Sequence, residues 1–219
     1  FYDINGDCSM SNIKLVHSGG NSVSLTTPTS NPASNITFKL PQSDGTAGQV
    51  LQTDGNGNLS WVTLGVTMVD HWRVTANSTA GAEAVLTDWA QVSTANQQPG
   101  RIGSSMSVSS GVFTFPSTGI YNIIGSFAYY FGSANDAIGQ VWLKVTNDNS
   151  NYNIVTSWRA GSHEDNIHHT VTQNYILDVT STSNVKFYFE TDSFSGNTSL
   201  RGDANIGESN VTIIRLGDT

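Results

Sequence analysis

The densest group of side chains able to do chemistry lies in residues 163–169, where three histidines and two carboxylates occur within seven residues. Imidazole and carboxylate groups are common ligands of divalent metals in proteins. The candidate ligands are His163, Glu164, Asp165, His168 and His169. A polar loop between strands explains the same residues, and we favour that interpretation. We therefore predict no resident metal and no other cofactor, with a bound divalent cation as the alternative.

The segments 135–136 and 147–149 are rich in asparagine and aspartate, and they too could be either a cation site or structural turns. Their oxygens suit Ca²⁺, but the chain has no Asp-x-Asp-x-Asp-Gly loop, so turn formation is the better explanation. Residues 201–203 spell the integrin-binding tripeptide Arg-Gly-Asp, yet Gly-Asp is also ordinary turn chemistry. We expect structural turns at all three places.

No catalytic constellation is visible in the sequence. The chain has no Gly-x-Ser-x-Gly nucleophile elbow, no phosphate-binding loop and no His-Glu-x-x-His pair. Cleavage of polysaccharide usually needs paired carboxylates, and glutamate is scarce here. We predict that the protein is not an enzyme.

Aromatic side chains near the ends of predicted loops are the stronger functional signal. Sugar rings and protein partners both bind to exposed aromatic groups. The receptor-binding candidates are Tyr152, Trp158, Arg159 and His163. The alternative is that such rings fill a core. We expect the contacts to a receptor to come from the loops around residues 147–151 and 158–169.

Composition and charge restrict the class of protein. Only 12% of the 219 residues are charged, and the net charge is −8. Nucleic acids and anionic membrane surfaces require clustered lysine and arginine, so we predict neither as a partner. No apolar run is long enough to span a bilayer, and the single Cys8 cannot form an internal disulfide. Because the chain begins at Phe1 without an initiator methionine or a signal peptide, we expect a fragment or a processed product.

Residues 1–65 are expected to form a separate, β-rich segment. Strands are predicted at residues 12–16, 21–26, 35–40, 49–52 and 58–62. The Asp-Gly-Asn-Gly sequence at 54–57 predicts a hairpin between the last two strands. Each strand offers only two or three apolar side chains, which is too few for a core within one chain. We therefore expect a shaft in which copies of the segment wrap around each other, with a disordered linker as the alternative.

Residues 66–219 are expected to form one all-β domain. Ten strands are predicted, at residues 68–75, 85–92, 105–108, 111–115, 119–131, 137–147, 152–158, 168–180, 184–191 and 210–216. Short strands separated by turns predict a sandwich or jelly roll. The strand at 119–131 is apolar at nearly every position, so we expect both of its faces to be covered, one of them by a second subunit.

The sequence Gly-Val-Phe-Thr-Phe-Pro-Ser-Thr-Gly-Ile-Tyr at 111–121 resembles the signature of the globular heads of complement component 1q and of tumour-necrosis-factor-like proteins. The order of the flanking strands agrees over residues 68–216, although Thr-Ser-Asn at 182–184 stands where the family usually has Gly-Asp. The resemblance implies a ten-stranded jelly roll that forms a compact homotrimer. The candidates for the trimer core are Phe113, Phe115, Tyr121, Phe127, Tyr129 and Phe131.

Residues 21–28, 36–41 and 48–61 resemble shaft segments of fibre proteins from marine tailed bacteriophages, and residues 215–219 resemble the end of their heads. The resemblance implies an intertwined trimeric β-shaft, residues 1–65, followed by a ten-stranded jelly-roll head, residues 66–219. The expected function is that of a structural, non-enzymatic fibre on the virion whose head attaches to the host. The expected partners are other virion proteins and a cell-surface glycan or protein.

Two other functions fit the same sequence. One is a capsid decoration or collar fibre that binds no receptor. The other is a secreted complement 1q- or tumour-necrosis-factor-like module for binding or signalling. The shaft-like segment and the missing signal peptide count against the secreted module.

Overall fold

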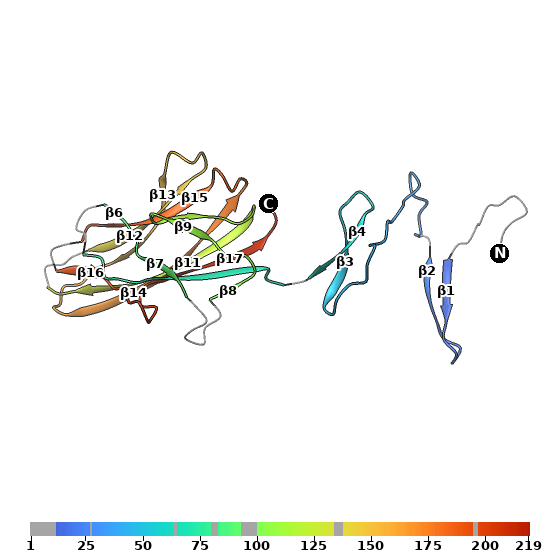
Figure 1. The fold of residues 1–219 in the computed structure, drawn as a ribbon, viewed down its shortest axis with the longest axis horizontal. Coiled ribbons are helices and arrows are strands. Elements are labelled where there is room, and N and C mark those ends of the chain that lie inside the picture. Colours follow the sequence, from blue (N-terminus) through green and yellow to red (C-terminus); the bar gives the residue numbers. More distant parts are fainter. Residues whose placement is uncertain are drawn as a thin grey trace, which may run out of the picture. The chain divides into compact units, whose positions relative to one another are not determined.

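The computed structural model describes residues 12–26, 28–63, 65–79, 83–92, 100–133, 138–194 and 197–219 (Figure 1). These residues form strands and no helix, so the predicted all-β class is confirmed. The described part accordingly contains no helix long and apolar enough to cross a membrane. The chain divides into two compact units between residues 63 and 64.

The first unit contains two β-hairpins. The hairpin partners are β1 (Asn12–Val16) with β2 (Ser22–Thr26), and β3 (Gln49–Thr53) with β4 (Leu59–Thr63). The second hairpin is the one predicted from Asp-Gly-Asn-Gly. The Asp54 carboxylate accepts hydrogen bonds from the N–H groups of Asn56 and Asn58 at 2.8 and 3.1 Å, which holds the turn.

The strand predicted at residues 35–40 does not form. Within this segment only Lys39 makes a β-bridge, to Asn58 immediately before β4. Polar and apolar residues alternate here, but a strand also needs a neighbour along its length, and Pro41 lacks the N–H that would extend the ladder. Ile36 and Phe38 therefore remain 63% and 62% exposed.

One face of the β1–β2 hairpin is entirely apolar. Ile13 lies opposite Leu25, and Leu15 lies opposite Val23. These side chains keep 56%, 72%, 69% and 72% of their surface exposed, respectively. A two-stranded hairpin is marginally stable alone in water, so this face requires cover that the described residues of one chain do not supply.

The second unit is a sandwich of two antiparallel sheets (Figure 1). Sheet A consists, in spatial order, of β13 (Asn153–Ala160), β12 (Gly139–Thr146), β15 (Lys186–Asp192), β10 (Val112–Thr114) and β9 (Ser107–Ser109), with β6 (Ala84–Val85) beside β15. Sheet B consists of β14 (Ile167–Val179), β11 (Gly119–Phe131), β17 (Asn210–Gly217), β5 (Met68–Val74) and β7 (Trp89–Gln91), with β16 (Thr198–Leu200) beside β11 and β8 (Arg101–Ile102) beside β5. The chain crosses repeatedly between the sheets, which is the jelly-roll arrangement that the sequence predicted. The predicted strand at 85–92 is divided between β6 and β7, one in each sheet.

A layer of aromatic rings joins the two sheets. Phe113 of sheet A stacks on Phe187 at 4.8 Å between ring centroids and meets the edge of Trp72 from sheet B at 5.7 Å. Phe127 of sheet B lies 5.2 Å from Phe189 of sheet A. Such pairs contribute about 0.5–1.5 kcal/mol each beyond the burial of their surface.

The Gly-x-Phe-Thr signature forms the turn before this layer. Ser110 and Gly111 have φ values of 48° and 80° and join β9 to β10 as a two-residue hairpin loop. A Cβ on Gly111 would lie 2.4 Å from the Leu86 carbonyl oxygen, so only glycine fits. Tyr121, at the other end of the signature, donates its hydroxyl hydrogen to the Ser117 carbonyl at 2.9 Å.

The candidates for the trimer core belong instead to the core of a single chain. Each of the six is between 0% and 3% exposed without any partner: Phe113, Phe115, Tyr121, Phe127, Tyr129 and Phe131. A side chain already removed from water cannot be buried further by a second subunit, so this assignment was wrong. In β11 the odd-numbered residues point into the sandwich, and the even-numbered residues remain half-buried on the outward face.

Tyr121 provides a test of this core. Replacing Tyr121 by Ala should lower the free energy of unfolding by about 3–5 kcal/mol, because a buried ring is lost. Tyr121→Phe is the matched control. It keeps the ring and loses only the hydrogen bonds to Ser117, so it should cost about 1 kcal/mol. Urea denaturation followed by circular dichroism measures both, and equal losses in the two variants would contradict a packing role for the ring.

Candidate functional site

The outward face of sheet A gathers aromatic and charged side chains. In β12 the side chains of Val141 and Leu143 are fully buried, so the alternation of the strand turns Trp142 and Lys144 outward. In β15 the buried Phe187 and Phe189 likewise leave Tyr188 and Glu190 on the outward face. We call Trp142, Lys144, Tyr152, Tyr188 and Glu190 the aromatic platform.

An ion pair lies at the centre of the platform. The Lys144 ammonium is 2.5 Å from the Glu190 carboxylate, and the two side chains are only 14% and 7% exposed. Burial disfavours the charged ammonium, but the hydrogen bond and the charge of Glu190 outweigh it and raise the pKa of Lys144. The ammonium also lies 5.3 Å from the centroid of the Trp142 ring, within the range of a cation–π contact.

Two tyrosines extend the platform beside the ion pair. The rings of Tyr152 and Tyr188 lie 4.7 Å apart at an angle of 47°. Burial raises the pKa of both hydroxyls, and the charge of Glu190 adds to the effect at Tyr188. Both phenols therefore stay protonated at neutral pH, where each can donate and accept a hydrogen bond.

A row of polar side chains, which we call the polar row, borders the platform on β13, β12 and β15. The Arg159 guanidinium donates a hydrogen bond to the side-chain amide oxygen of Gln140 at 2.9 Å. The side-chain amide nitrogen of Gln140 in turn donates to the Asp192 carboxylate at 2.5 Å. Burial alone would raise the pKa of Asp192, but hydrogen bonds from Ser193 and Gln140 lower it. Asp192 is therefore a carboxylate under ordinary conditions, and the row is a connected set of charged and amide groups.

The receptor-binding candidates are divided by the fold. Tyr152 belongs to the platform and Arg159 to the polar row, so two of the four lie on this face. His163 is exposed in the loop after β13. Trp158 was assigned wrongly to a ligand surface.

Trp158 is fully buried because its position in β13 points into the sandwich. Its indole N–H donates to the Gly125 carbonyl at 2.9 Å, and its ring lies 5.2 Å from Phe127. A Cβ on Gly125 would lie 2.7 Å from the indole, so the glycine leaves space for the ring. Trp158 therefore holds β13 against β11 and cannot touch a partner.

The candidate metal ligands are not brought together in one chain. His168 and His169 are neighbours in β14 and point to opposite faces, His168 toward Tyr130 at 5.0 Å and His169 toward Phe131 at 5.7 Å between ring centroids. His163, Glu164 and Asp165 lie in the preceding loop. Across the residues that the structure describes, no group of three His, Cys, Asp or Glu side chains could hold a metal.

The remaining motifs serve as turns wherever they are described. The carboxylate of Asp148 accepts hydrogen bonds from the N–H groups of Ser150 and Asn151 at 2.9 and 2.8 Å and from the Asn151 amide at 2.7 Å. In the Arg-Gly-Asp tripeptide, the N–H of Arg201 donates to the Ala128 carbonyl and that of Asp203 to Val74, so the segment is held against the domain. Residues 135–136 lie outside the described residues.

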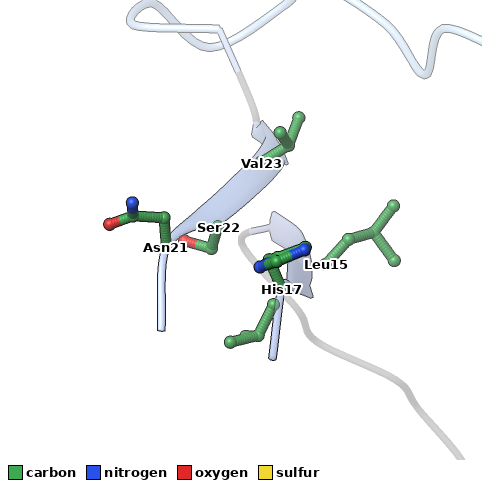
Figure 2. A pocket seen from close by; sticks show the side chains of 6 residues that line it. Leu15, His17, Asn21, Ser22 and Val23 are labelled. Atoms are coloured by element: carbon green, nitrogen blue, oxygen red, sulfur yellow. The ribbon is translucent and has the colours of Figure 1, made fainter. Parts of the chain in front are cut away.

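The hollow at the turn end of the β1–β2 hairpin is not a second candidate site. Figure 2 shows Leu15 and Val23 on the two strands, with His17, Asn21 and Ser22 near the turn. Leu15 and Val23 are about seven-tenths exposed, at 69% and 72%. The side chains therefore border open solvent and converge on no enclosed space.

Sequence reasoning missed Trp142, Lys144, Tyr188 and Glu190. The available signal was the alternation of residues 185–190, which predicts one buried and one wet face and places Tyr188 on the wet one. An aromatic ring at a wet position of an alternating strand is the pattern that would have identified the platform.

No family model and no curated protein matches the sequence. Solved structures do match the head. The Eiger TNF of S. frugiperda aligns with a TM-score of 0.54 and 13% identity, over 69% of this chain and 93% of that one. Murine APRIL at pH 5.0 aligns with a TM-score of 0.50 and 10% identity, over 68% of this chain and 98% of that one.

The head is a tumour-necrosis-factor-like jelly roll. This finding agrees with the resemblance carried by residues 111–121, and it extends to the fold alone because the identities are low.

The aspartate turn in the 147–151 loop predicts a pH effect. Hydrogen bonds from Asn151, Thr146 and Ser150 lower the pKa of Asp148 in the folded protein. A carboxylate with a lowered pKa stabilises the fold above its unfolded pKa of about 4, and this contribution disappears as the pH falls further. Asp148→Asn should therefore reduce the fall in melting temperature between about pH 5 and about pH 2. Asp88→Asn, at another exposed aspartate, is the control. If the melting temperatures of wild type and Asp148→Asn fell equally between about pH 5 and about pH 2, the prediction would be contradicted.

Proposed function

We propose that the chain is a homotrimeric, non-enzymatic fibre protein of a tailed-phage virion, and that its head attaches the virion to the host cell. The observation that carries the proposal is the combination of a tumour-necrosis-factor-like head with a preceding unit in which no described residue of the chain covers the apolar face of the β1–β2 hairpin. A fibre built from several copies would supply that cover. The resemblance of residues 21–28, 36–41 and 48–61 to phage shaft segments supports the same assignment.

The outward face of sheet B supports self-association of the head. One row of directly paired residues crosses β14, β11, β17, β5 and β8, and it consists of Ile176, Asn122, Ile214, Val69 and Ile102. Four of these five side chains are apolar. Ile176 and Ile102 keep 49% and 52% of their surface exposed, which is costly on a face that no other layer formed by the described residues of the second unit covers.

Host attachment is assigned to the head because it offers the more varied surface. Sheet A carries the aromatic platform and the polar row on its outward face, and neither belongs to the face that we assign to the trimer. Three copies would present three platforms, so weak individual contacts could still hold a virion through avidity. The net charge of −8 per chain disfavours affinity that rests on attraction to an anionic cell surface.

Two isoleucines of equal exposure test the trimer. Ile176 of sheet B is 49% exposed and Ile154 of sheet A is 50% exposed. Wild type should have three times the chain mass of 23.4 kDa by light scattering. Ile176→Arg should shift the mass toward that of one chain, because three buried arginines would meet at the interface, while Ile154→Arg should leave it unchanged. A wild-type mass of 23.4 kDa at micromolar concentration would overturn the trimer.

The function itself is tested with the intact chain and cells. Fluorescently labelled full-length protein should bind a subset of strains in a panel of marine bacterial isolates, and unlabelled protein should block the adsorption of phages that infect those strains. Ile176→Arg should bind more weakly, since avidity is lost. A folded trimer that binds none of the strains and blocks no phage would favour the decoration or collar fibre.

A further inference from the structure

We propose that the aromatic platform binds a neutral, hydroxyl-rich glycan of the cell surface, with sugar rings packed on Trp142 and Tyr188 and sugar hydroxyls bonded to the Lys144 ammonium and the Tyr188 hydroxyl. The inference rests on the proposed function, because it names the class of surface molecule that the head would hold. It places the site on the face of sheet A, with Tyr152 from the β12–β13 connection at its border.

The register of β12 and β15 places four side chains of the platform at the corners of a square on the sheet face. Trp142 lies directly opposite Glu190, and Lys144 lies directly opposite Tyr188. The two aromatic groups therefore occupy one diagonal and the two charged groups the other. Diagonal neighbours in a sheet are about 7–8 Å apart, so rings on one diagonal can flank a ligand that reaches the ion pair between them.

The aromatic diagonal suits the apolar face of a sugar ring. Trp142 and Tyr188 are both half-buried, so each presents part of a ring to solvent while its base is held by neighbours. Tyr152 packs against Tyr188 at 4.7 Å and widens the aromatic surface. Rings held in place lose little conformational entropy when a ligand stacks on them.

The charged diagonal suits hydroxyl groups, which both donate and accept hydrogen bonds. The Lys144 ammonium has three N–H donors and donates one hydrogen bond to Glu190. The protonated phenol of Tyr188 hydrogen-bonds to Glu190, and its oxygen can still accept a hydrogen bond from a ligand hydroxyl. Burial of an ion pair costs free energy unless its remaining donors and acceptors also form hydrogen bonds. Ligand hydroxyls can supply such bonds to the Lys144 ammonium.

The charges of this face favour a neutral ligand. Lys144, Lys186 and Arg159 are balanced by Glu190 and Asp192 on the same sheet face and by Glu83, whose charge acts on Lys144. The chain as a whole is negative. An anionic glycan would therefore gain little attraction here and would meet the repulsion of the whole chain.

The experiment titrates the full-length protein with neutral oligosaccharides of glucose, galactose and mannose, and with oligogalacturonate as an anionic probe. Tryptophan fluorescence and calorimetry report binding. At least one neutral series should bind, with a spectral change that Trp142→Ala removes. Tyr188→Ala should weaken binding about tenfold, the equivalent of one lost stacking contact.

Two variants separate recognition from folding. Tyr188→Phe preserves the packing of the ring, so it should remain folded with only a small fall in melting temperature from the lost bond to Glu190, while its affinity falls about threefold through the lost hydrogen bond to the ligand. Tyr130→Ala removes a half-buried tyrosine from the outward face of sheet B and should leave the affinity unchanged. Equal affinity of wild type, Trp142→Ala and Tyr188→Phe would overturn the platform as the site.

The outcomes distinguish this inference from the proposed function. Cell binding by wild type that persists in Trp142→Ala, together with no response to any neutral oligosaccharide, would overturn the glycan site and leave the fibre function intact. Binding of oligogalacturonate alone would overturn the neutral ligand. Binding of neutral oligosaccharides without adsorption to any strain would support the glycan site and contradict attachment to those cells.

Discussion

The layer of aromatic rings between sheets A and B is the contact on which the rest of the head depends. Phe113, Phe187, Phe127 and Phe189 occupy alternate positions of β10, β15 and β11, and all four are fully buried. Because strand side chains alternate strictly, fixing these residues inward fixes their neighbours outward. The outward position of Tyr188 in β15 therefore follows from the burial of Phe187 and Phe189 beside it.

Much of the fold follows from local patterns. The strand at 119–131 and the hairpin around 54–57 have the predicted positions because a continuous apolar run and turn chemistry are properties of short segments. The segment 35–40 alternates cleanly between polar and apolar residues and forms no strand, since pairing depends on a partner that the pattern does not contain. The division of 85–92 between two sheets has the same origin, because only the folded chain decides which neighbour each half meets.

The candidate site was less accessible to sequence reasoning. Tyr152 and Arg159 lie on the exposed face, but Trp158 was misplaced because residues 153–158 do not alternate cleanly. The register of β13 against β12 shifts between Leu143 and Lys144, and such a bulge changes which residues face inward. The Lys144–Glu190 pair joins residues 46 positions apart and has no signature in either strand alone. Similarly, the adjacent residues His168 and His169 suggest one set of metal ligands in the sequence, but in a strand their side chains point to opposite faces.

The alternation in β12 and β15 also bears on how such a head can change over generations. Val141, Leu143, Phe187 and Phe189 carry the packing, while the residues between them carry the surface chemistry. Selection on the surface can therefore act on every second codon of a strand without disturbing its neighbours. A lineage that meets a new surface chemistry has a mutational path through positions 142 and 188 that leaves the fold intact, as expected where sites are carried on a shared scaffold. In related heads we would expect the outward residues of these strands to differ more than the inward ones, so that variable and conserved positions alternate along each strand.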